Sequence, residues 1–244
     1  MEQKNQQNNT FDNWSIFDEC KNINLTDDIK KQLNDYYNLV VEENNKYNLT
    51  RITDENDFYE KHIVDSLLFT NVYPIYDQKM ADIGSGAGFP GIVLKIFFPE
   101  TKITLIESNN KKANFLNLAI SRLGLKDIEV SSERAEVFSV EHKEEFDVVI
   151  SRAVAYLDII LEIGVQMLKV DGVYILLKGP RAQEEMNNSG NLPTKLNLSL
   201  KDTQILSDTG FGTRVNLFYQ KNGHTDAKYP RKYATIKKES GINK

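Results

Sequence analysis

Apolar residues recur at two different spacings along the chain, and the change between them divides it into two parts. From Thr26 to about Asn45, and again from Asp54 to Thr70, apolar side chains return every three to four residues, as on the buried face of a helix. Thr26 is also a residue type that caps helix N-termini. From Lys79 onward, short apolar runs alternate with helical patterns. The pattern therefore predicts a small helical extension followed by an α/β domain.

The apolar runs after Lys79 have the length of buried strands. They occupy Met80–Ile83, Ile103–Glu107, Ile128–Ser131, Phe146–Ser151 and Val173–Lys178. Helical patterns lie between several of them, at Phe89–Phe98, Lys111–Leu123 and Val154–Leu168. This alternation predicts a mostly parallel sheet with helices on both faces, which is a Rossmann-like arrangement.

The last part of the domain lacks a helical pattern between its strand patterns. Two further strand patterns, Leu198–Leu206 and Thr213–Gln220, are separated only by Ser207–Gly212. A connection of this length is too short for the helical crossover that parallel strands need. We therefore expect these two strands to pair antiparallel.

The predicted boundaries follow from these patterns and from the two ends of the chain. The Gln/Asn-rich start has no apolar core, so it is neither a secretory signal nor an anchor and is expected to be disordered. The end is rich in Lys and Arg. We predict a disordered tail at 1–13, a helical extension at 14–78, an α/β domain at 79–222 and a basic tail at 223–244.

Composition limits the class of protein. No apolar run among the 244 residues approaches the ~18 residues of a membrane span. The one cysteine, Cys20, excludes an internal disulfide and a cysteine-based metal site, and it favours a reducing, cytoplasmic setting. No metal is expected. The net charge of −5 argues mildly against a polyanionic partner, but the basic C-terminal tail allows a local nucleic-acid face.

A glycine-rich turn between the first strand and the first helix of the domain has two interpretations. Gly86-x-Gly88-x-x-Gly91 fits the fingerprint of a nicotinamide-dependent dehydrogenase. The overlapping pattern Asp82-x-Gly84-x-Gly86-x-Gly88 fits S-adenosylmethionine, because a carboxylate suits a cationic ligand and repels a pyrophosphate. Glu107 ends the second strand, where a carboxylate can accept both ribose hydroxyls in either case.

Two features outside the turn favour S-adenosylmethionine. The antiparallel end of the sheet is typical of methyltransferases. The segment Arg134-Ala135-Glu136 follows the third strand, where the adenine edge of that ligand would lie. The glycine turn is therefore interpreted as the floor of a methyl-donor site.

Several motifs together resemble one family, the bacterial ribosomal small-subunit guanine-N7 methyltransferases, also called glucose-inhibited division protein B. The motifs occur in the order of that family and span roughly residues 30–240. They are Asn48-Leu49-Thr50, His62-Ile63-Val64-Asp65-Ser66, Asp82–Gly91, Arg134-Ala135-Glu136, Ser151-Arg152-Ala153, Leu177-Lys178-Gly179 and Lys228-Tyr229-Pro230-Arg231-Lys232. After Lys232 the chain departs from the family, since the usual Gly and Pro are absent from Tyr233–Lys238.

The resemblance implies a class I methyltransferase fold, S-adenosylmethionine as methyl donor, and a guanine N7 of 16S ribosomal RNA, free or in the small subunit, as acceptor. It implies cofactor contacts at Gly84, Phe89, Ala135, Glu136 and Arg152, to which the turn adds Asp82, Gly86 and Gly88, and the fold adds Glu107. It implies catalytic or RNA-facing roles for Arg134 and Arg152, with His62, Lys111 and Lys178 as further candidates. Phosphate contacts are expected from Lys111, Lys112, Arg122, Arg181, Arg214, Arg231 and Lys232.

The expected chemistry needs no general base. Guanine N7 already carries a lone pair, so methyl transfer can proceed by direct in-line displacement, with Arg152 near the base to offset developing charge. Three alternatives remain open from the sequence: a nicotinamide-dependent dehydrogenase, a non-catalytic RNA-binding module that keeps the pocket, and a small-molecule methyltransferase. A monomer is the default expectation.

Overall fold

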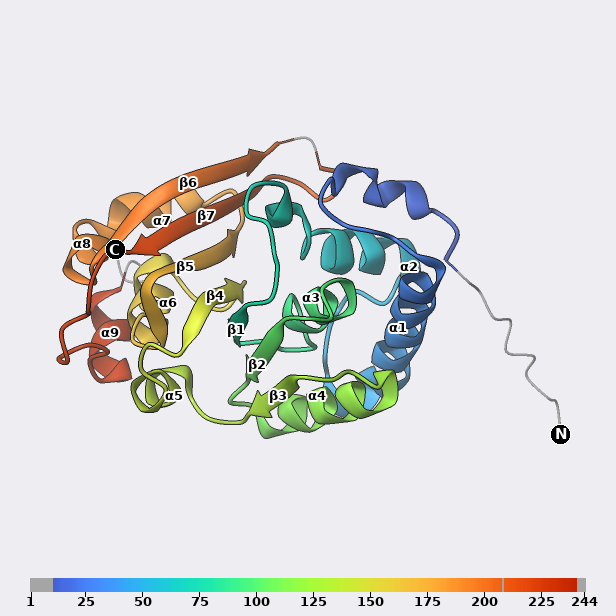
Figure 1. Cartoon of the computed structure of the whole chain (residues 1–244), viewed down its shortest axis with the longest axis horizontal. Helices are drawn as coiled ribbons and strands as arrows, with labels where there is room; N and C mark the ends of the chain where they lie inside the picture. Colours follow the sequence, from blue (N-terminus) through green and yellow to red (C-terminus); the bar gives the residue numbers. More distant parts are fainter. Residues whose placement is uncertain (1–10, 208, 241–244) are drawn as a thin grey trace, which may run out of the picture.

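A twisted sheet forms the centre of the molecule (Figure 1). In the computed structural model, which describes residues 11–207 and 209–240, it has seven strands in the order β3-β2-β1-β4-β5-β7-β6. The strands are β1 (Lys79–Ile83), β2 (Lys102–Ile106), β3 (Ile128–Ser131), β4 (Phe146–Arg152), β5 (Leu168–Lys178), β6 (Leu198–Leu206) and β7 (Arg214–Lys221).

The pairing of the strands confirms the predicted topology. Strands β1 to β5 pair in parallel, whereas β7 pairs antiparallel with both β5 and β6. The order reverses at β1, whose neighbours are β2 on one side and β4 on the other. In sheets of this kind, ligands bind beyond the carboxyl ends of the strands beside such a reversal. The fold therefore directs attention to the segments that follow Ile83, Ile106 and Arg152.

Helices cover both faces of the sheet, as predicted (Figure 1). Alternate residues of each strand point to opposite faces, so Met80 and Val148 pack with the helices of one face, and Ala81 and Val149 with those of the other. The first face carries η1 (Trp14–Glu19), α1 (Asp27–Tyr47), α2 (Glu55–Phe58), η2 (Tyr59–Val64), η3 (Leu68–Asn71), α3 (Gly91–Phe97) and α4 (Asn110–Leu123). The second carries α5 (Ala135–Glu141), α6 (Leu157–Gly164), α7 (Ala182–Ser189), α8 (Leu192–Lys195) and α9 (Tyr233–Glu239).

The helical extension differs in one respect from its predicted form. The first helix is capped as expected, because Thr26 Oγ1 accepts a hydrogen bond from the Ile29 backbone N–H. The second, predicted as continuous from Asp54 to Thr70, is divided into α2, the π-helical η2 and the 3₁₀ segment η3. A π-helical turn widens the helix and shifts the facing of its side chains, and such turns are frequent at functional sites.

The ends of the chain extend the two faces. Of the predicted disordered tail, residues 1–10 lie outside the described residues. Phe11, however, is 4% exposed and stacks on Tyr59 with ring centroids 3.8 Å apart, so the packed structure begins before residue 14. The tail beyond residue 222 ends in α9, which the sequence patterns do not predict. Between residues 11 and 240, apart from 208, no helix has the length and apolarity to cross a membrane.

Candidate active site

The glycine turn lies directly after β1. Gly84 and Gly86 have φ values of 71° and 60°, in the left-handed region that favours glycine. The Gly84 N–H donates to the Ile106 carbonyl at 2.7 Å, which fixes the turn beside the end of β2. The turn thus presents backbone, without intervening side chains, to the space beyond the strand ends.

Asp82 supports the turn from beneath. Its side chain is fully buried, and Oδ2 accepts a hydrogen bond from the Gly91 N–H at 3.0 Å. Oδ1 is also buried, and it has no hydrogen-bond partner within the described part of the chain. Burial raises the pKa of this carboxyl to about 7, against the lowering effect of its hydrogen bond to Gly91. Asp82 therefore ties the start of α3 to β1 and leaves one acceptor oxygen unused.

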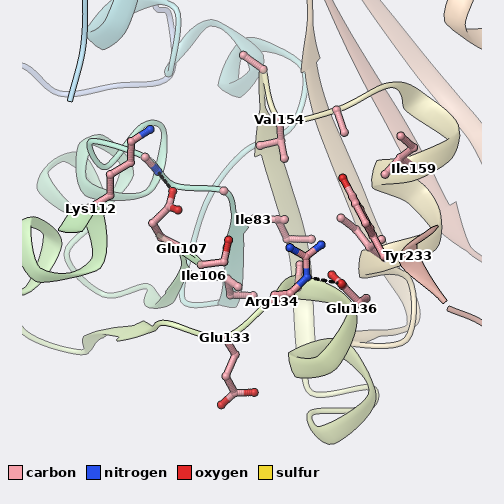
Figure 2. A pocket seen from close by; sticks show the side chains of 17 residues that line it. Ile83, Ile106, Glu107, Lys112, Glu133, Arg134, Glu136, Val154, Ile159 and Tyr233 are labelled. Carbon is pink, nitrogen blue, oxygen red and sulfur yellow. Dashed lines mark hydrogen bonds and ion pairs between the residues drawn. The ribbon is translucent and has the colours of Figure 1, made fainter. Parts of the chain in front are cut away.

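A cavity of about 300 Å³ opens over the turn (Figure 2). Its walls come from the ends of β1 and β2, the starts of α4 and α5, the loop after β4, and α9. Glu107 is its principal acid, since Oε2 accepts from the Gly86 N–H at 2.9 Å and Oε1 from the Asn109 N–H at 2.8 Å. Each oxygen can accept a further hydrogen bond from a ligand. The cavity can therefore bind hydroxyl groups at its Glu107 side.

The opposite wall of the cavity carries an arginine. Figure 2 shows the Arg134 guanidinium pointing inward between Ile83 and Tyr233, whereas Glu133 points away. Arg134 Nε donates to Glu136 Oε1 at 2.5 Å, and its Cζ lies 4.5 Å from the centre of the Tyr233 ring. These contacts hold a planar cationic group at the rim of the cavity.

A second and larger cavity, of about 690 Å³, adjoins the first. It is rich in cationic side chains: Lys61, Arg152, Lys178, Arg181 and Arg214 line it, against two acids, Asp65 and Glu185. The excess of positive charge favours an anionic ligand such as a nucleic-acid backbone. The two cavities share part of their walls, namely Ala153, Val154, Ala155, Ile159 and Tyr233.

Arg152 is fixed at the floor of the second cavity by contacts from several elements. Its NH1 donates to Asp65 Oδ2 and to the Lys61 carbonyl, both at 2.9 Å. Asp65 Oδ1 accepts in turn from Arg214 Nε at 2.8 Å. One buried carboxylate thus binds two guanidinium groups, from β4 and β7, and joins the helical extension to the sheet. Asp65 directly follows the π-helical η2.

His62 completes this network in its neutral form. Nδ1 lies 3.0 Å from Arg152 NH2, and Nε2 lies 2.9 Å from Thr50 Oγ1. Because the guanidinium can only donate, Nδ1 accepts and the ring proton is on Nε2. Burial, together with the charge of Arg152, lowers the pKa of His62 to about 3. Both ring nitrogens are engaged, so His62 positions Arg152 and is not available as a base.

Lys178 anchors the loop after β4, which borders both cavities. Its Nζ donates to the Ala155 carbonyl at 2.7 Å and to Glu185 Oε2 at 2.8 Å. The same Glu185 oxygen accepts from the Leu157 N–H at 2.8 Å. Burial lowers the pKa of Lys178, and the pairing with Glu185 opposes that effect. The contacts indicate that Lys178 holds the loop after β4 against α7.

The structure distributes the remaining expected residues among three places. The first cavity is lined by Gly84, Gly86, Glu107, Lys112, Arg134, Ala135 and Glu136, and the second by His62, Arg152, Lys178, Arg181 and Arg214. Phe89 lies in the core instead, 5% exposed and stacked on His62 at 4.4 Å, because the helical extension covers it. Asp82 and Gly88 are buried beneath the turn, and Lys111, Arg122 and Lys232 are exposed outside both cavities.

Sequence reasoning missed some residues of the site. Asp65 could have been identified, since it belongs to the motif His62–Ser66 and is the kind of acid that pairs with arginine. Tyr233 gave no signal, because it stands in the segment where the chain departs from the family pattern. Arg231 is correctly placed in the tail, but it binds the buried Glu162 and so does not extend freely toward RNA.

Comparisons with known proteins show which family the chain resembles. Residues 29–209 match the family model described as rRNA small subunit methyltransferase G. The chain is 60% identical over 94% of its length to ribosomal RNA small subunit methyltransferase G of Mycoplasma capricolum, covering 99% of that protein. It is 59% identical over 95% of its length to the Mesoplasma florum protein of the same name, covering 98% of it.

A solved structure supports the fold alone. M. jannaschii TYW2 in complex with AdoMet aligns with a TM-score of 0.54 and 17% identity, over 70% of this chain and 79% of that one. The match to the family model covers most of the chain, and the two relatives are covered almost completely. The chain therefore belongs to the rRNA small subunit methyltransferase G family.

Proposed function

We propose that this protein transfers the methyl group of S-adenosylmethionine to a guanine N7 of 16S ribosomal RNA. The first cavity is the donor site and the second is the acceptor site. One observation carries the proposal: the two cavities adjoin, since Ala153–Ala155 and Tyr233 line both, so ligands in the two would lie next to each other. A reaction between two bound molecules needs this adjacency.

The residues of the first cavity suit S-adenosylmethionine. Glu107 keeps acceptor capacity on both oxygens for ribose hydroxyls, and the turn at Gly84 and Gly86 offers backbone at close approach. The unpartnered Oδ1 of Asp82 adds acceptor character beneath the turn, which suits the cationic methionine end. A pyrophosphate would meet the Asp82 carboxylate unfavourably, which disfavours the nicotinamide alternative.

The chemistry needs orientation more than proton transfer. S-adenosylmethionine, when bound, supplies an electrophilic methyl group. Guanine N7 presents a lone pair, so its methylation requires no base. His62 supplies none, because both of its ring nitrogens are engaged. Arg152, held by Asp65, would orient the base by donating toward its O6 and would offset the positive charge that the ring acquires.

Contacts with RNA are assigned to cations around the acceptor cavity and beyond it. Arg181 and Arg214 line the cavity, and Lys111, Arg122 and Lys232 are exposed cations of the kind that bind phosphates. Each phosphate neutralised would change the slope of log K against log salt by about −0.7 for single-stranded RNA. We further propose a monomer that acts in the cytoplasm, on 16S RNA or the small ribosomal subunit.

The test is transfer of labelled methyl from S-adenosylmethionine to small subunits, or to their RNA, from a strain that lacks this gene. Nucleoside analysis should place the label on N7-methylguanine, and label on a protein or another base would refute the assignment. Arg152→Gln should lower the rate strongly. The variant should keep its fold, because Asp65 still has Arg214 as a partner. Lys126→Gln, at an exposed lysine outside both cavities, serves as the control.

The same assay distinguishes the proposed enzyme from an RNA-binding module without activity. Such a module would bind the ribosomal RNA but transfer no label. Titration with S-adenosylmethionine and NAD in parallel tests the dehydrogenase alternative, which requires binding of NAD.

A further inference from the structure

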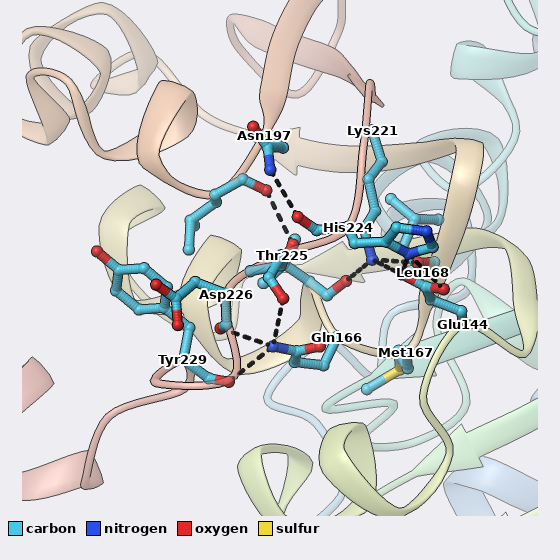
Figure 3. A network of polar contacts seen from close by, with 12 residues as sticks. Glu144, Gln166, Met167, Leu168, Asn197, Lys221, His224, Thr225, Asp226 and Tyr229 are labelled. Atoms are coloured by element: carbon cyan, nitrogen blue, oxygen red, sulfur yellow. Dashed lines mark hydrogen bonds and ion pairs between the residues drawn. The ribbon is translucent and has the colours of Figure 1, made fainter.

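The C-terminal tail is fixed to the domain by polar contacts at its base (Figure 3). Gln166 Nε2 donates to the carbonyls of Asp226 and Tyr229, at 3.1 and 2.8 Å. Asn197 Nδ2 donates to the His224 carbonyl at 2.6 Å. Backbone carbonyls of the tail are therefore bound by side chains of the domain, which gives the segment after β7 one defined path.

A buried ion pair fixes the next part of the tail. Glu162 of α6 is 0% exposed, and its Oε1 accepts from the Arg231 backbone N–H at 2.8 Å and from Nε at 2.9 Å. Oε2 accepts from Arg231 NH2 at 2.8 Å. A buried carboxylate bound by both backbone and guanidinium tolerates little movement of its partner. Arg231 therefore sets the position of the residues that follow it.

Tyr233 is the residue that this anchoring brings to the site. Since Tyr233–Glu239 contains neither Gly nor Pro, the segment can form α9, and α9 begins at Tyr233. The ring is half-buried and borders both cavities. One of its faces carries the Arg134 guanidinium at 4.5 Å, within the range of a cation–π contact (Figure 2).

We propose that Tyr233 is a positioning residue of the donor site. Its ring holds the Arg134 guanidinium at the rim of the first cavity, where that group stacks on the adenine of S-adenosylmethionine. The C-terminal tail thereby completes the donor site. This inference rests on the proposed function and names a part of the chain that acts on the same site.

The physical reason is the freedom that Arg134 would otherwise have. Its side chain is 52% exposed, and besides the Tyr233 ring it pairs with Glu136. A long exposed arginine held at one point samples many rotamers, and ordering it on binding would weaken affinity. A guanidinium already held over an aromatic ring loses little further freedom, and its planar face is of the kind that stacks on nucleobases.

The test measures the dissociation constant of the full chain for S-adenosylmethionine by calorimetry. Tyr233→Ala and Tyr233→Leu should each raise it by about 3- to 10-fold, the range expected when one long side chain must be ordered on binding. Tyr233→Leu keeps apolar packing, so it should lower affinity without a matching loss of thermal stability. Tyr233→Phe, which keeps the ring, should remain within about 2-fold. Tyr76→Ala, at a tyrosine 63% exposed and outside both cavities, should change nothing.

A double-mutant cycle separates positioning from packing. If Tyr233 acts through Arg134, then Arg134→Gln with Tyr233→Ala should bind no more weakly than Arg134→Gln alone. S-adenosylhomocysteine carries the same adenosine, so its affinity should fall by the same factor. Equal affinities for the wild type and Tyr233→Leu, or fully additive losses, would overturn the inference while leaving the methyltransferase assignment intact. Failure of the wild type to bind either ligand would instead refute the proposed function.

Discussion

The neutral state of His62 makes folding stability depend on pH in a way that one substitution can isolate. In the folded protein its pKa is about 3, because it is buried and faces Arg152. In the unfolded chain a histidine titrates near pH 6.5. Below about pH 6.5 the unfolded chain binds a proton at His62, whereas the folded protein does not. His62 therefore lowers stability as the pH falls from about 6.5 toward 3.

The size of the effect follows from the two pKa values. Each unit of difference corresponds to about 1.4 kcal/mol, counted from the unfolded pKa down to the working pH. At about pH 5 the loss of stability due to His62 is therefore about 2 kcal/mol, and at about pH 7.5 it is close to zero. The contribution of Asp82 to stability changes with pH in the opposite direction. Its pKa in the folded protein is about 7, so its protonation there increases stability as the pH falls below 7.

Comparison with His62→Gln removes the contribution of Asp82, which both proteins share. Glutamine can accept from Arg152 and donate to Thr50, as the neutral imidazole does. Urea unfolding at about pH 7.5, 6 and 5 should show the stability of the variant improving relative to the wild type by about 2 kcal/mol toward acid. A difference that stays constant over this range would refute the buried, neutral histidine. So would an NMR titration that assigns His62, one of three histidines, a pKa near 6.5.

Further substitutions test other parts of the site. Gly88→Ala should destabilise the fold by about 2–4 kcal/mol in urea unfolding, because φ is 103° and a Cβ would lie 2.6 Å from Ile92 and from the Tyr36 hydroxyl. Asp65→Asn should cost about 3 kcal/mol of stability and reduce methyl transfer, since the two arginines it binds lose their common counter-charge; unchanged unfolding would show that the carboxylate is dispensable. Glu107→Gln should raise the S-adenosylmethionine dissociation constant about 10-fold by calorimetry, because a charged acceptor becomes neutral; an unchanged constant would remove Glu107 from the donor site.

The strands and their parallel or antiparallel directions could be predicted from the sequence because their signals are local. The run Phe146–Ser151 is apolar throughout because a central parallel strand is buried on both faces, and the structure extends it by one residue as β4. The short connection between β6 and β7 required antiparallel pairing, whatever the rest of the fold. The helical extension was recognised by its period, but its π-helical turn was not, since η2 has the same spacing of apolar residues as an ordinary helix over so short a stretch.

The polar residues of the first cavity were also encoded locally. Gly84, Gly86 and Glu107 follow strand ends, and the topology of a parallel sheet brings all strand ends to one edge. Phe89, which was expected to contact the cofactor, is buried against His62, because an apolar ring beside a helical extension is more stable when buried. Adjacency to the turn in sequence did not determine on which side of the backbone its side chain would lie.

Sequence alone determined the fold class, the glycine turn and the acids and arginines from which the site is built. Tertiary structure decided which of them act together. Asp65 and Arg214 are 149 positions apart in the chain, yet they form one network with Arg152. Tyr233 borders the cavity two residues after Arg231, which pairs with a buried carboxylate on α6. Such pairings depend on how distant segments pack, and no local period or spacing records that.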